Sequence, residues 1–219
     1  MDSKTILAKA EIIRKQLLKE ENGKKYLDAE NGKIPVPYLG KKTIKLIIIG
    51  QDPTVRNENS RKGIKTVLNL DKKDGLLFNY IKEISNSLNC DIYENVYATN
   101  LLKCFFTMPP AGVKNLVSEQ TSYWLPLLQE EISAYPEAKI ITLGEPVFQA
   151  LVSSGFKKVN GYWAYCGNTT ANVNNFSYCK AEDNKLHKDI FPFPHQPTWK
   201  RNKFYGKYFA QYAQYVNKK

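Results

Sequence analysis

The chain has 219 residues, of which 42% are hydrophobic, so it can bury one sizeable core, and we predict a single domain over residues 1–219. Its 32 basic residues against 21 acidic ones give a formal net charge of +11, which favours a polyanionic partner. No run of about 20 apolar residues occurs, which excludes a transmembrane helix, and the N-terminal segment is too charged for a secretory signal. We therefore expect a cytoplasmic protein.

The predicted elements alternate between helix and strand along the chain. Ser3 is a candidate cap for the first helix. Apolar residues recur at helical spacing in the segments 6–17, 77–88, 124–132 and 145–151. Short apolar runs typical of buried strands lie at residues 43–49, 96–100, 139–143 and 189–193. Residues 156–185 are rich in asparagine and aromatic side chains, and we interpret them as an irregular insertion that contains a hairpin.

This alternation predicts an α/β fold: a three-layer α/β/α sandwich around a mainly parallel, four-stranded central sheet. Ligands of such sheets bind at the carboxyl ends of the strands. Gly50 permits a tight exit from the first strand, and Pro53 keeps Asp52 out of the helical conformation. The sequence therefore predicts that the Asp52 carboxylate is held at this edge of the sheet.

Three polar residues of different chemistry lie at the ends of three of the predicted strands, namely Asp52, Asn100 and His195. Each has an ordinary structural explanation, because an aspartate before a proline is common in turns, an asparagine can cap a helix and a histidine can satisfy a buried carbonyl. Their joint position at strand ends favours a shared functional site over three unrelated explanations.

The remaining composition restricts the chemistry further. The chain contains only four arginines, so attraction to phosphates with little sequence preference fits better than extensive reading of guanine edges. The four cysteines are widely spaced and form no C-x-x-C pair, so we expect free thiols and neither a metal nor a cofactor.

Several motifs resemble those of the uracil-DNA glycosylase superfamily. Gly50-Gln51-Asp52-Pro53 resembles its water-activating motif, and residues 194–198, Pro-His-Gln-Pro-Thr, resemble its C-terminal His-x-Pro-Ser loop. Residues 97–104 are similar to the strand that carries its base-reading asparagine, and residues 140–144 resemble the strand before its penultimate helix. The resemblance covers residues 43–209 in the same order.

The resemblance implies a role for each strand-end residue. Asp52 would stabilise the sugar cation and position water, His195 would hydrogen-bond the base oxygen, and Asn100 would pair with the edge of uracil. The residues implied in binding the substrate beside Asn100 are Gly50, Gln51, Pro53 and Thr54. Those implied in contacting DNA are Pro197, Thr198, Trp199, Lys200 and Arg201. Trp199 would act as a wedge in the base stack, and the alternative is that it packs against the last helix.

The chain also departs from the family pattern. Thr54 stands where one branch has a tyrosine that excludes the thymine methyl group, and the segment after Gly63 lacks the aromatic residue that stacks on uracil. Only Cys104 lies near a ligand position of the iron–sulphur branch, so no cluster is expected.

The resemblance implies a monomeric DNA glycosylase that removes uracil, or a related deaminated base, from single- or double-stranded DNA and initiates base excision repair. The alternative is a non-catalytic nucleic-acid or protein-binding module on the same scaffold. A phosphohydrolase is disfavoured because Thr54 stands where a second acid is expected, and a P-loop enzyme is disfavoured because its glycine-rich motif is missing from the sequence.

Overall fold

The computed structural model describes residues 2–30, 33–53, 57–153 and 157–219. Its central sheet has the order β1-β3-β2-β4-β7. The strands span Tyr38–Leu39 (β1), Leu46–Gly50 (β2), Val96–Asn100 (β3), Lys139–Leu143 (β4) and Ile190–Phe193 (β7). The last four run parallel, and β1 pairs antiparallel with β3. The α/β class and the mainly parallel sheet are therefore as predicted.

The prediction of four strands is wrong, because β1 adds a fifth at the edge of the sheet. It contains only Tyr38 and Leu39, which pair with Ala98 and Tyr97. Two residues are too few to produce the alternation of polar and apolar side chains by which a strand is recognised.

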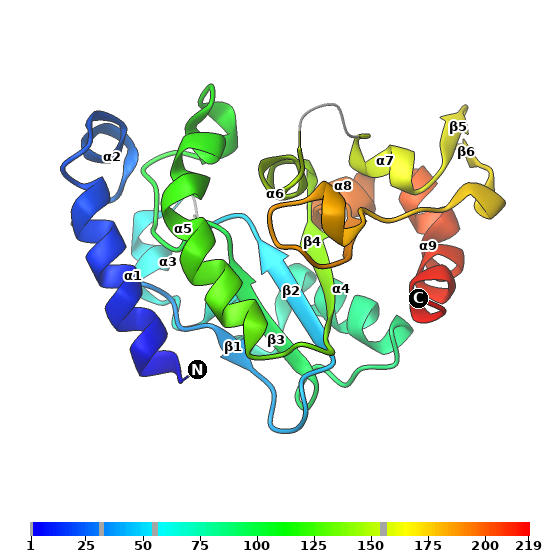
Figure 1. Cartoon of the computed structure of the whole chain (residues 1–219), viewed down its shortest axis with the longest axis horizontal. Helices are drawn as coiled ribbons and strands as arrows, with labels where there is room; N and C mark the ends of the chain where they lie inside the picture. Colours follow the sequence, from blue (N-terminus) through cyan, green and yellow to red (C-terminus); the bar gives the residue numbers. More distant parts are fainter. Residues whose placement is uncertain (1, 31–32, 54–56, 154–156) are drawn as a thin grey trace.

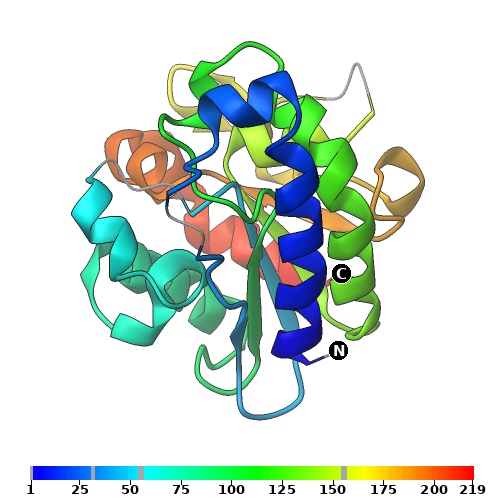
Figure 2. The same cartoon turned by 90° about the vertical axis from the view of Figure 1, so that its left-hand side faces the viewer.

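Helices lie on both faces of the sheet (Figures 1 and 2). One face is covered by α1 (Ser3–Leu17) and α5 (Leu116–Ser133), and the other by α4 (Gly75–Ser87) and α9 (Lys203–Asn217). This explains why every residue of β2 and β3 is buried. The predicted cap of the first helix shifts by one residue, because the Asp2 carboxylate accepts bonds from the backbone N–H groups of Lys4 and Thr5.

The shorter helices connect these layers. They span Glu21–Tyr26 (α2), Glu58–Lys62 (α3), Glu145–Leu151 (α6), Val159–Tyr162 (α7) and Gln196–Arg201 (α8), with 3₁₀ turns at Val67–Lys72 (η1), Pro110–Gly112 (η2), Val173–Asn175 (η3) and Ala181–Asp183 (η4). In the described part of the chain, no helix combines the length and the apolar character needed to cross a bilayer.

The predicted insertion contains a short hairpin of β5 (Tyr165–Gly167) and β6 (Thr170–Ala171). It is tied to the main body by aromatic packing, because the buried Trp163 ring stacks on Tyr212 of α9 with centroids 4.2 Å apart. The Trp163 indole N–H also donates to the Pro192 carbonyl of β7 at 2.8 Å. The insertion thus supports the strand that leads to His195.

Candidate active site

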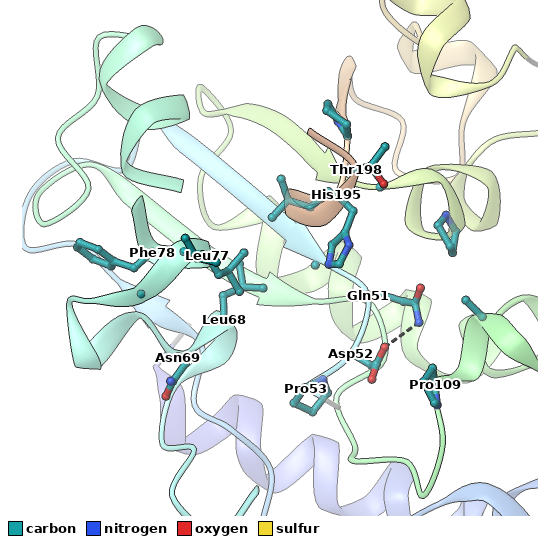
Figure 3. Close-up of a pocket in the computed structure, with 18 of the residues that line it drawn as sticks. Gln51, Asp52, Pro53, Leu68, Asn69, Leu77, Phe78, Pro109, His195 and Thr198 are labelled. Atoms are coloured by element: carbon teal, nitrogen blue, oxygen red, sulfur yellow. Dashed lines mark hydrogen bonds between the residues drawn. The ribbon is translucent and has the colours of Figure 1, made fainter. Parts of the chain in front are cut away.

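The predicted strand ends meet at one edge of the sheet. Gly50, the last residue of β2, lies in register with Asn100, the last residue of β3. A pocket of about 940 Å³ opens at this edge and is lined by residues 50–53 after β2 and by His195 and Thr198 after β7 (Figure 3). Two of the three predicted side chains, those of Asp52 and His195, therefore line the same cavity.

The Asp52 carboxylate is half-buried at the wall of this pocket. The side-chain amide of Gln51 donates a hydrogen bond to Asp52 Oδ1 at 2.7 Å (Figure 3). Pro53, which is buried, follows directly and supplies no N–H group. Because the amide holds one carboxylate oxygen, the orientation of the acid is restricted before any ligand arrives.

His195 is held from both sides of its backbone. Its carbonyl accepts the first bond of α8, from Trp199 N at 2.9 Å, and the preceding Pro194 carbonyl accepts from the Tyr80 hydroxyl at 2.7 Å. The imidazole points into the pocket toward Gln51 and Asp52 (Figure 3).

Close approach of the backbone at Gly144 allows this placement. Gly144 has a φ of +96°, and a Cβ atom there would lie 3.1 Å from His195 Cβ. Only glycine combines this backbone conformation with the space that His195 needs.

The pKa of His195 lies below its ordinary value. The side chain is exposed at the pocket, yet neighbouring atoms remove enough of its hydration to disfavour the charged form, and the Arg201 guanidinium lowers the pKa further. The imidazole is therefore neutral at pH 7 and has one ring N–H available as a donor.

Asn100 does not line the pocket, although the sequence predicts that it does. Its side chain is 1% exposed, and neither its Oδ1 nor its Nδ2 atom has a hydrogen-bond partner among the described residues. A Cβ atom on Gly50 would lie 2.5 Å from Asn100 Oδ1 and 2.8 Å from Leu68 Cδ2. The amide thus lies next to Gly50, and Gly50 and Leu68 both line the cavity.

A buried network fixes the end of β3. The Lys103 ammonium donates to Thr99 Oγ1 at 2.8 Å and to the Asn100 carbonyl at 3.2 Å, and it forms an ion pair with Glu131 of α5. The Tyr97 hydroxyl donates to the same carboxylate at 2.6 Å, and burial and the Glu131 charge raise the pKa of Tyr97. The network therefore couples the Asn100 backbone to the helix behind the sheet.

The residues predicted to contact DNA lie on α8. Thr198 lines the pocket, Lys200 and Arg201 are exposed, and Arg201 Nε donates to the Pro197 carbonyl at 3.1 Å. Trp199 stacks on Tyr80 of α4 with centroids 4.9 Å apart, and its ring also contacts Phe209 of α9, the last helix, as the alternative interpretation predicts. Contact of these residues with DNA stays a prediction. Thr54 lies outside the described residues.

The apolar wall of the pocket was not predicted. It is formed by Ile64, Leu68, Leu77 and Phe78, so one aromatic side chain lines the pocket although the segment directly after Gly63 contains none. Leu68 and Asn69 both adopt left-handed backbone conformations with φ of 55°, which is rare for a branched side chain such as leucine. No periodic pattern in the sequence signals such a turn.

Among the described residues, no group of three or more histidine, cysteine, aspartate and glutamate side chains is arranged to hold a metal ion. All four cysteines are free, and only Cys166 is exposed.

An acid and an imidazole that face one pocket at the carboxyl edge of a parallel sheet define this chain as an α/β protein with a candidate hydrolytic site. The family model of the "Uracil DNA glycosylase superfamily" matches residues 37–217, so the chain belongs to this superfamily. This membership points to DNA glycosylase chemistry and DNA repair in general, with DNA as the substrate. No curated protein matches the chain.

Proposed function

We propose that this protein hydrolyses the N-glycosidic bond of uracil, or of a related deaminated base, in DNA and thereby starts base excision repair. The observation that carries the proposal is the placement of Asp52 and His195 in one pocket. The superfamily match supports glycosylase chemistry in general, and the choice of uracil rests on the resemblance of the motifs around these two residues.

The two side chains suit the two charges of the transition state. As the bond between C1′ and the base nitrogen breaks, positive charge develops on the sugar and the electron pair moves onto the base. The Asp52 carboxylate opposes the sugar charge and accepts a proton from the water that attacks C1′. The neutral His195 imidazole donates its N–H to the base oxygen on which negative charge grows.

Base recognition by Asn100 requires a local rearrangement. Its amide is buried without a hydrogen-bond partner beside Gly50, which lines the cavity together with Leu68, whereas Asn100 itself does not line it. We infer that the incoming base displaces the Leu68 side chain and pairs with the Asn100 amide, while Leu77 and Phe78 of the apolar wall take the place of the aromatic stacker that the segment after Gly63 lacks. A buried amide that gains partners only in the complex would favour the matching base strongly.

The test is base release from uracil-containing oligonucleotides in single turnover. The Asp52→Asn variant should lose activity by a factor on the order of 10² or more, because the charge opposing the sugar cation is removed, while duplex binding persists. Asp183→Asn, a change of the same kind in η4 outside the pocket, should retain the wild-type rate. Equal rates for wild type and Asp52→Asn would remove Asp52 from the mechanism.

The second candidate is a non-catalytic nucleic-acid-binding module. The buried position of Asn100 outside the pocket lining favours it, because a module that only binds DNA needs no access to a base-reading amide. Wild-type protein that binds duplex DNA but releases no base from uracil, hypoxanthine, xanthine or thymine mismatches would support this candidate against the glycosylase.

A further inference from the structure

Two exposed apolar side chains belong to segments that line the pocket. Leu76 is 60% exposed and lines the cavity, and Met108 is 44% exposed and directly precedes Pro109, which also lines it. Their chain neighbours Leu77 and Pro109 lie on opposite sides of the site (Figure 3). One exposed apolar side chain thus lines the cavity, and a second lies one residue from the lining on the opposite side.

Leu76 is held rigidly although it is exposed. It is the second residue of α4, whose residues Phe78 and Ile81 are buried in the core. Gly75 turns the chain into this helix with a φ of +87°. Lys72 lines the same wall and forms no ion pair with a described residue, so a cation with an unshared charge lies close to the leucine in the pocket lining.

Met108 lies on the other rim, in the segment between β3 and α5. The cavity is lined there by Pro109 and Ala111, so this rim carries no charged side chain of its own in the pocket lining. A methionine side chain is flexible and adapts to irregular apolar surfaces.

Trp199 is engaged elsewhere. Its ring stacks on Tyr80 and contacts Phe209 with centroids 6.0 Å apart, so a wedge made of this indole would have to leave the aromatic core beneath α8. The described large apolar side chains that are exposed are Ile12, Leu39, Leu76, Met108, Tyr165 and Val173, and two of these six adjoin the pocket.

We propose that Leu76 and Met108 enter the base stack of duplex DNA on the two sides of the extruded nucleotide, and that they do so in place of Trp199. The inference rests on the proposed function, since it assumes that a nucleotide leaves the duplex and enters this pocket. Leucine and methionine are among the side chains that proteins insert between base steps, and unstacking a step exposes apolar base faces that such side chains cover. Lys72 would hold the adjacent phosphate on the Leu76 side.

The test compares duplex with single-stranded substrate. Leu76→Ala and Met108→Ala should each slow base release from a G·U duplex by about 10-fold, because extrusion from the stack is no longer assisted, and should change the rate on single-stranded DNA by less than about 2-fold. Leu39→Ala is the matched control, since Leu39 is 51% exposed on β1 and lies outside the pocket lining, and it should leave both rates unchanged.

Equal losses on the two substrates would overturn the inference, because they would show that these side chains act within the pocket, and so would unchanged rates on the duplex. A second measurement separates this result from failure of the proposed function. A 2-aminopurine placed beside the uracil should brighten when wild-type protein binds the duplex and should stay dim with Leu76→Ala. If the wild type releases no base, this signal still supports or overturns the insertion of Leu76.

Discussion

The imidazole of His195 shows how a single side chain is tuned by its surroundings. Partial loss of hydration and the nearby Arg201 charge both lower its pKa from the ordinary value of histidine. Arg201→Gln should move the pKa upward, because one of the two causes is removed, whereas Lys200→Gln should leave it in place.

These shifts can be measured from the imidazole C2 proton by NMR titration, with His187→Asn used to assign the two histidine signals. A pKa in Arg201→Gln that equals that of the wild type would show that the guanidinium does not act on His195. Activity that depends on the neutral imidazole should fall as pH decreases through the His195 pKa, and the same substitution should move this acid limb to higher pH.

At the scale of elements, the buried pair of Lys103 and Glu131 joins β3 to α5. Lys103→Met should lower the free energy of unfolding by about 3–5 kcal/mol, because Glu131, which is 1% exposed, would be left with an uncompensated charge. The double variant Lys103→Met, Glu131→Gln should recover most of the loss, since the amide that replaces the carboxylate would be neutral and could still accept the Tyr97 hydrogen bond. Urea denaturation measures the free energy of unfolding of the wild type, the single variant and the double variant.

The matched control for this prediction is Lys42→Met, which removes an exposed ion pair with Glu94 and should cost less than about 1 kcal/mol. If Lys103→Met costs no more than Lys42→Met, the buried network does not stabilise the fold.

The elements themselves were largely predictable. The strands at residues 96–100 and 139–143 have the predicted bounds, because short segments of mainly apolar and β-branched residues between polar segments have few other interpretations. The edge strand β1 and the left-handed turn at Leu68 were missed, since the first is too short for periodicity and the second depends on packing against Gly50.

The candidate site was predictable in part for the same reason. Asp52 and His195 follow strands that the sequence predicts, and both line the pocket. Asn100 is buried beside Gly50 and Leu68, and its burial depends on how these residues pack, which no local pattern in the sequence encodes. The apolar rim at Leu76 and Met108 likewise appears only when segments on either side of β3 are brought together.

At the scale of the whole molecule, the net charge of +11 should make DNA binding sensitive to salt. Lys200 is exposed on α8 beside the pocket, so Lys200→Ala should reduce the slope of log K against log salt by about 1 for an undamaged duplex. Lys9→Ala removes a cation that pairs with Glu130 on the far side of the sheet and should leave the slope unchanged. Fluorescence anisotropy at several salt concentrations measures the slope for both variants. Equal slopes for Lys200→Ala and the wild type would show that cations other than Lys200 contact the phosphates.

Because Asp52 and His195 lie far apart along the polypeptide, translation completes the site only after most of the chain has been synthesised. The carboxylate leaves the ribosome early, but the imidazole follows only after β4 and the hairpin have been made, and α9, whose Tyr212 stacks on Trp163, emerges later still. A nascent chain therefore carries the acid without its partner. Under the proposed function, base release requires synthesis of all these elements, so a product truncated before His195 is expected to release no base.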